Sequence, residues 1–95
     1  MNGGGIRKPL LKGNITYNDC LTVKPFNNMA ILIRCKGSVI RDALELGASK
    51  LPEENGGFIQ VSGLTYTINT TKPSAVKLDE KGNFVKVEGE YRYLI

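Results

Sequence analysis

Asn2–Arg7 reads Asn-Gly-Gly-Gly-Ile-Arg, and this short run sets the expectations for the rest of the chain. Three consecutive glycines can adopt positive φ without steric cost and let a ligand come close to the backbone. Their successive N–H groups would then form a concave anion-binding nest. Arg7 adds a planar fork of donors suited to a phosphate, and Asn2 adds an amide suited to a heterocycle edge or a sugar. The alternative is a flexible, tag-like N-terminus, since chain ends are often poorly ordered.

The composition is that of an ordinary globular chain with one domain at most. Its 95 residues include 13 Lys and Arg and 9 Asp and Glu, for a net charge of +4. The basic residues are scattered, so the charge argues only weakly for nucleic acid. There is no His, which removes the usual neutral-pH acid–base group and the commonest metal ligand. No apolar run is long enough to span a membrane, and the start of the chain lacks the layout of a signal peptide.

Two cysteines, Cys20 and Cys35, are too few for a zinc site, and their spacing matches no redox motif. They could form one disulfide. The favoured interpretation is that both are small buried hydrophobic residues.

A first short helix is predicted from about Tyr17 to Val23. Thr16 is a good N-cap, and Asp19 three residues later completes an acidic variant of the capping box. Pro25 ends the helix, because proline cannot continue it.

The turn after this helix, Pro25-Phe-Asn-Asn28, holds Phe26 on a stiff corner beside two amides. There an aromatic ring could stack on a ligand ring while an amide reads the edge of that ligand. The alternative is a core phenylalanine that closes the helix against the next strand.

The middle of the chain predicts a strand and then a second helix. Met29–Lys36 alternates as a strand that is largely buried at its start. Ser38 is expected to cap a helix that runs to about Gly47. Its inner stripe is expected to be Ile40, Ala43, Leu44 and Gly47, with Asp42 and Glu45 facing solvent.

The second half of the chain is β-rich after a loop over residues 48–57, in which Glu53 and Glu54 are interpreted as solvated charge. Residues 58–69 favour strand with an interruption at residues 62–63. Ala75–Asp79 and Phe84–Val87 predict a hairpin, and residues 91–95 predict one more strand. Helices first and then a run of strands indicate an α+β fold, with a mixed, mainly antiparallel sheet and two short helices.

The sequence contains no set of residues that forms a recognisable catalytic motif by itself. The glycines lack the Gly-Lys-Ser/Thr of a phosphate-binding loop, and there is no nucleophile elbow, Cys–His pair or HExxH motif. We therefore expect no catalytic residue and no metal ligand here. What remains is a binding surface with a glycine turn, an arginine, an aromatic ring and several amides.

Taken together and in order, five motifs resemble the C-terminal domain of the 5'-nucleotidase / UDP-sugar hydrolase / 2',3'-cyclic phosphodiesterase family. The resemblance extends from Asn2 to about Arg92. The motifs are Asn2–Arg7, Gly13–Tyr17, Val23–Asn28, Lys36–Glu45 and Gly56–Leu64.

The resemblance implies a nucleotide-recognition role. Members of this family are two-domain, metal-dependent phosphohydrolases that are typically secreted, periplasmic or surface-anchored. Their N-terminal metallophosphoesterase domain holds two divalent metal ions, such as Zn or Mn, and hydrolyses the phosphoester. The C-terminal domain binds the nucleoside.

Five residues of this chain match family positions that contact the substrate. Asn2 and Arg7 match nucleotide contacts, with Arg7 at the ribose or phosphate. Phe26 matches the first of two aromatic residues that sandwich the base. Asn28 matches an amide that reads the base edge, and Gly56 matches a backbone position that lines the base pocket.

The departures from the family pattern predict a partial domain over residues 1–95. The second sandwiching aromatic residue and an acidic ribose contact belong to a later segment, and the metal domain and an upstream strand with its arginine are also missing. The fragment is expected to bind nucleotide weakly and to be inactive alone. Two alternatives remain: a small anion- or nucleic-acid-binding module, or an interaction module that self-associates through an exposed sheet edge.

Overall fold

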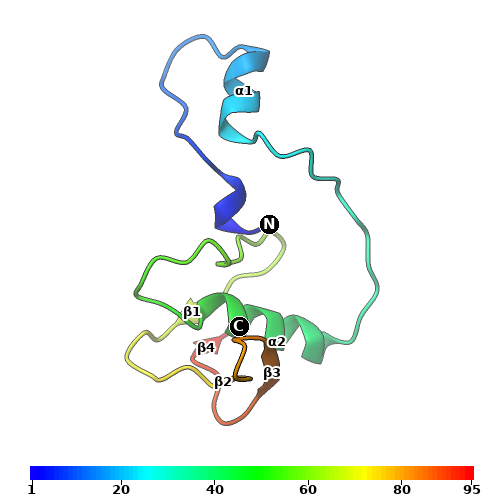
Figure 1. Ribbon diagram of the computed structural model, residues 1–95, viewed down its shortest axis with the longest axis vertical. Coiled ribbons are helices and arrows are strands. Elements are labelled where there is room, and N and C mark those ends of the chain that lie inside the picture. Colours follow the sequence, from blue (N-terminus) through cyan, green and yellow to red (C-terminus); the bar gives the residue numbers. More distant parts are fainter.

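The computed structural model describes residues 1–95, which form an N-terminal arm (residues 1–36) and a C-terminal α+β layer (residues 37–95) (Figure 1). The molecule measures 48 × 31 × 30 Å along its principal axes. The α+β class is confirmed by two helices and short antiparallel strand pairs. The elements are the 3-10 helix η1 (Gly3–Gly5), α1 (Tyr17–Val23), α2 (Gly37–Ala48), β1 (Thr67–Ile68), β2 (Val76–Leu78), β3 (Phe84–Val87) and β4 (Tyr93–Leu94).

Helix α1 has the predicted bounds and the predicted capping box. The Thr16 hydroxyl accepts a hydrogen bond from the Asp19 N–H, and the Asp19 carboxylate accepts one from the Thr16 N–H at 2.8 Å. The hydrogen bond from the Thr16 N–H, and after it the one that the Thr16 hydroxyl donates to the same carboxylate oxygen at 2.9 Å, favour the charged carboxylate and hold the pKa of Asp19 below its usual value. Thr16 and Asp19 are three residues apart, so this capping box forms without any contact to distant parts of the chain.

Helix α2 confirms the second predicted helix but corrects its cap and its buried face. Its N-cap is Lys36, which makes no side-chain capping hydrogen bond, so the predicted role of Ser38 is wrong. Leu44 and Gly47 are buried as expected. Ile40 is largely exposed, whereas Glu45, expected in solvent, is completely buried.

The Glu45 carboxylate is buried because it serves backbone donors from the C-terminal part of the chain. It accepts hydrogen bonds from the N–H of Ala75 at 3.1 Å and from the N–H of Arg92 at 3.0 Å. A buried carboxylate is tolerated only when such partners replace water. Glu45 therefore joins α2 to the strands that follow it.

The strands form two separate antiparallel pairs. β2 and β3 make the predicted hairpin, with Val76 opposite Val87, and the Asp79 carboxylate accepts from the N–H groups of Lys81 and Asn83 in its turn. β1 pairs with β4, so the strand predicted over residues 91–95 is present. Of the β-rich stretch at residues 58–69, only β1 and an isolated bridge from Ile59 to Asn2 pair as strands.

A small core lies between α2 and these strands. Its buried apolar residues are Leu44, Ala48, Ala75 and Tyr93. Arg92 is buried beside them and donates to the carbonyl oxygens of Ala48, Ser49 and Thr70. The guanidinium thus satisfies carbonyls at the C-terminal end of α2 that have no partner within the helix.

Met29–Lys36 does not form the predicted strand. The segment runs as an open arc from α1 round to α2 (Figure 1), and no hydrogen bond involves the backbone of residues 25–35. A strand exists only with a neighbour to pair with, and this segment has none.

The expected burial of Cys20 and Cys35 is also wrong, because both are free and exposed. Neither α1 nor α2 has the length and apolar composition of a membrane span.

Candidate functional site

The glycines of Asn2–Arg7 allow a close backbone contact instead of forming an anion nest. None of Gly3, Gly4 and Gly5 has positive φ, so that expectation is wrong. The N–H of Gly3 donates to the Phe58 carbonyl and that of Gly4 to the Gly56 carbonyl, each at 2.8 Å. These donors are therefore occupied, and the nest hypothesis fails with them. A Cβ on Gly4 would lie 3.0 Å from the Gly56 oxygen, which explains the glycine there.

Asn2 and Gly56, two of the predicted site residues, are in direct contact. The Asn2 side-chain nitrogen donates to the Gly56 carbonyl oxygen at 3.0 Å. The amide oxygen of Asn2 makes no hydrogen bond within the protein, which leaves one acceptor for a ligand.

Arg7 and Phe26 are also brought together. The Arg7 N–H donates to the Val23 carbonyl at 2.7 Å, which ties the residue after η1 to the end of α1. As a result, the Arg7 guanidinium carbon lies 5.9 Å from the centroid of the Phe26 ring, within the range of a cation–π contact. Phe26 is 53% exposed, so the alternative of a core phenylalanine is wrong.

A hollow of about 510 Å³ joins Asn2 to Asn28. Its lining residues come from the N-terminus, η1 and the start of the open arc: Met1, Asn2, Gly5, Lys24, Asn28, Met29, Ala30 and Ile31. Arg7, Phe26 and Gly56 do not line it. The predicted residues thus form two neighbouring groups linked through η1 and the turn at residues 25–28. Lys24 adds a cation to the hollow, although it was not among the residues predicted from the sequence. Its position directly before the Pro-Phe-Asn-Asn turn could have indicated that it lies near the site.

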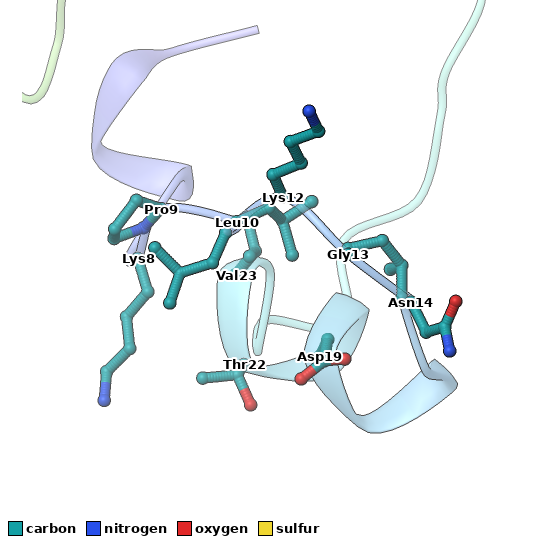
Figure 2. Close-up of a pocket in the computed structure, with 11 residues that line it drawn as sticks. Lys8, Pro9, Leu10, Lys12, Gly13, Asn14, Asp19, Thr22 and Val23 are labelled. Carbon is teal, nitrogen blue, oxygen red and sulfur yellow. The ribbon is translucent and has the colours of Figure 1, made fainter.

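A second hollow, of about 350 Å³, lies between the loop at residues 8–15 and α1, and it contains none of the predicted site residues. In Figure 2 the Lys8 and Lys12 side chains extend in opposite directions, away from each other. Their charges do not converge on one point, so this hollow is not an anion site.

The site offers binding groups rather than reacting groups. No group of three or more His, Cys, Asp or Glu side chains is placed to hold a metal ion. The residues present therefore do not form a metal centre. An amide, a guanidinium and a half-exposed aromatic ring are suited to holding a polar, planar ligand.

Comparison with known proteins finds similarity over the whole chain. The family model described as "5'-nucleotidase, C-terminal domain" matches residues 1–95. The 5'-nucleotidase of Vibrio parahaemolyticus is 35% identical over 95 residues, which is 100% of this chain and 16% of that protein. A trifunctional nucleotide phosphoesterase protein of Bacillus subtilis is 41% identical over 81 residues, or 84% of this chain and 6% of that protein.

A human 5'-nucleotidase is 35% identical over 85 residues, which is 83% of this chain and 15% of that protein. The chain therefore spans less than a fifth of the length of these relatives. No solved structure matches it.

Proposed function

The chain belongs to the family of 5'-nucleotidase C-terminal domains, and on that premise we propose that it recognises the nucleoside and phosphate of a nucleotide. In this proposal Phe26 stacks on the base and Arg7 binds the ribose or phosphate. Asn2, Asn28 and the backbone of Gly56 contact the base and the sugar.

The contact between Arg7 and Phe26 is the observation that carries the proposal. The guanidinium beside the ring places a positive charge next to a flat apolar surface. A nucleotide carries the matching groups, a negatively charged phosphate and a flat base. Arg7 uses one nitrogen, Nη1, on the Gly4 carbonyl at 3.2 Å. The other donors of its planar fork remain available for a phosphate.

The two amides support recognition of the nucleoside. Asn2 and Asn28 line the same hollow, and each side chain carries both donors and an acceptor. This matches the mixed donor and acceptor edge of a base. Gly4 and Gly56 lie in backbone contact beside Asn2, so the hydrogen bond from Asn2 to Gly56 sets the orientation of the amide.

The affinity of this open site is expected to be low. One aromatic face contributes about 1–3 kcal/mol to stacking on a base. With one arginine–phosphate contact in solvent, the total would reach about 4 kcal/mol, which corresponds to millimolar binding.

In this proposal, hydrolysis takes place on a separate N-terminal metallophosphoesterase domain that holds two divalent metal ions. The whole protein is exported from the cytoplasm. On the N-terminal domain the metal ions would activate the attacking water, while the present residues orient the substrate. We expect the 95-residue chain alone to release no phosphate from AMP, with or without added Zn²⁺ or Mn²⁺.

The proposal is tested by titrating the chain with AMP and with adenosine, followed by NMR. Arg7→Gln should weaken AMP binding more than adenosine binding, because only AMP carries the phosphate. Lys50→Gln, which removes a positive charge that makes no ion pair and no side-chain hydrogen bond, is the matched control. Equal loss of AMP binding in both variants would reduce the role of Arg7 to net charge. A salt-sensitive affinity for a single-stranded oligonucleotide would favour the nucleic-acid alternative instead.

A further inference from the structure

The chain contains two Asn-Gly sequences, Asn2–Gly3 and Asn55–Gly56, and every other asparagine is followed by a residue with a side chain. In an Asn-Gly sequence the glycine nitrogen can attack the carboxamide carbon of the asparagine, because glycine has no Cβ to hinder the approach and its backbone bends readily. Asparagine is among the thermolabile residues of proteins. Both sequences are therefore candidates for spontaneous deamidation, and the structure treats them differently.

At Asn2–Gly3 both reacting nitrogens are held by hydrogen bonds. The Gly3 N–H, which would supply the attacking nitrogen, donates to the Phe58 carbonyl at 2.8 Å. The Asn2 side-chain nitrogen, which would leave as ammonia, donates to the Gly56 carbonyl at 3.0 Å. Both hydrogen bonds must open before the reaction can begin, so the fold protects this sequence.

At Asn55–Gly56 the attacking nitrogen is free. The Gly56 N–H makes no hydrogen bond within the protein, and Gly56 is exposed, so solvent can remove its proton. The Asn55 carboxamide is folded back over the turn, where its Oδ1 accepts a hydrogen bond from the Gly57 N–H at 3.0 Å. The ring closed by this hydrogen bond includes both the Gly56 nitrogen and the carboxamide carbon. The same N–H is placed to stabilise the negative charge that develops on Oδ1 during the attack.

We propose that Asn55 is a site of spontaneous deamidation in this chain, whereas Asn2 is protected. The Gly56 nitrogen forms a bond to the Asn55 carboxamide carbon, the bond from that carbon to Nδ2 breaks, and ammonia leaves with the proton that the Gly56 nitrogen loses. Water then opens the cyclic imide. Addition of water to the former side-chain carbonyl gives aspartate. Addition to the main-chain carbonyl gives isoaspartate, in which the backbone runs through the side-chain carbons.

The isoaspartate product should disrupt the contact between η1 and Gly56. The backbone directly before Gly56 becomes longer by a methylene group and gains a negative charge. The Gly56 carbonyl accepts hydrogen bonds from the Gly4 N–H at 2.8 Å and from the Asn2 side chain. A Cβ on Gly4 would lie only 3.0 Å from the Gly56 oxygen, so the two backbones are in close contact and a shift of Gly56 must disturb η1.

Deamidation does not depend on nucleotide binding, because it rests on the turn at Asn55–Gly56. Only its effect on AMP affinity rests on the proposed function, since Asn2 would lose the hydrogen bond that orients its amide. The two proposals can therefore fail separately. A chain that binds AMP but keeps Asn55 intact refutes only the deamidation, and a deamidated chain that never bound AMP refutes only the proposed function.

Deamidation is tested by incubating the chain at mildly alkaline pH and physiological temperature, in buffer and in urea, followed by peptide mapping with mass spectrometry. In buffer, Asn55 should be converted at least about tenfold faster than Asn2, because two hydrogen bonds must open before Asn2 reacts. In urea, where the fold no longer protects Asn2, this difference should shrink. Equal rates in the folded chain would refute the protection of Asn2. Conversion of Asn55 in urea but not in buffer would overturn the proposal.

The effect on η1 is tested by NMR on the incubated chain. The amide protons of Gly3 and Gly4 should exchange with solvent faster once isoaspartate has formed at position 55. Asn55→Gln, incubated in parallel, is the control, because its longer side chain does not readily close a five-membered imide. Its amide exchange should not change with time. Unchanged exchange in a chain converted to isoaspartate would refute the disruption of η1.

The variant Asn55→Asp separates the new charge from the longer backbone. It carries the carboxylate of the product with an ordinary main chain, so the hydrogen bond from Gly4 to Gly56 should persist and the exchange of Gly4 should stay slow. Exchange as fast as in the isoaspartate form would refute the role given to the longer backbone.

Discussion

The guanidinium carbon of Arg7 lies 5.9 Å from the centroid of the Phe26 ring, although the whole of α1 separates the two residues in the chain. The hydrogen bond from the Arg7 N–H to the Val23 carbonyl, at 2.7 Å, closes this loop. The capping box of α1 helps, since it fixes the start of the helix whose end carries Val23. Four of the five proposed site residues therefore belong to the arm, and the fifth, Gly56, accepts hydrogen bonds from the Gly4 N–H and the Asn2 side chain.

The ring of Phe26 should contribute to nucleotide affinity through stacking. Phe26→Ala should weaken AMP binding by about 5- to 150-fold, the equivalent of 1–3 kcal/mol for one base on one aromatic face. Phe26→Tyr, which keeps the ring, should retain most of the affinity. In a full-length enzyme carrying this domain, Phe26→Ala should raise the Michaelis constant for AMP. An unchanged constant would remove Phe26 from the site.

The close approach of Gly4 to Gly56 should not tolerate a side chain. In Gly4→Ala the new Cβ would meet the Gly56 backbone oxygen at 3.0 Å, so the two backbones must separate and the hydrogen bond from Gly4 to Gly56 must lengthen. The amide protons of Gly3 and Gly4 should then exchange with solvent faster, as followed by NMR.

Gly37→Ala is the matched control for Gly4→Ala, because nothing lies within 4 Å of the new Cβ and alanine favours helix α2. It should leave the exchange of Gly3 and Gly4 unchanged. The same result for Gly4→Ala would show that η1 adjusts without strain.

The buried carboxylate of Glu45 should be essential for the C-terminal layer. Glu45→Ala leaves the N–H groups of Ala75 and Arg92 without acceptors, and each unsatisfied buried donor costs about 1–3 kcal/mol. Urea denaturation followed by circular dichroism should show a large loss of stability.

Glu54→Ala, at an exposed position, should change the stability little by comparison. Glu45→Gln, which keeps one carbonyl oxygen as an acceptor, should lie between the two. Equal stabilities of Glu45→Ala and Glu54→Ala would contradict the role given to this carboxylate.

The start of α1 should be sensitive to acid. Hydrogen bonds from Thr16 lower the pKa of Asp19 in the folded chain, so this carboxylate adds stability above its unfolded value of 3.8. That contribution is lost as the pH falls through the lowered pKa, when the carboxyl group becomes protonated. An NMR titration should show the Thr16 amide signal moving together with the Asp19 carboxyl signal. In Asp19→Asn the Thr16 amide should not titrate over this range, and a persistent titration would point to another group.

Two elements were predictable because their causes are local. The capping box of α1 involves residues three apart, and the β2–β3 hairpin closes around a turn whose Asp79 binds N–H groups two and four residues later. The pairing of Arg7 with Phe26 was expected from a family resemblance, and periodicity alone would not have suggested it. Whether these residues bind a nucleotide stays a prediction.

Other features depended on groups distant in the chain. The charge of Glu45 suggested solvent, and only the N–H groups of Ala75 and Arg92 explain its burial. The glycines of η1 suggested positive φ, whereas the approach of Gly56 accounts for Gly4. The alternation of Met29–Cys35 suggested a strand, but a strand needs a neighbour, and no part of the structure provides one.

The amino-acid sequence by itself determined the two helices, the hairpin and the family of this chain, because capping, turn chemistry and ordered motifs are written in residues close to one another. Only the tertiary structure decided which face of α2 is buried, what the glycines of η1 accommodate and which segment is left unpaired. Each of these depends on hydrogen-bond partners and packing neighbours that come together only when distant parts of the chain meet.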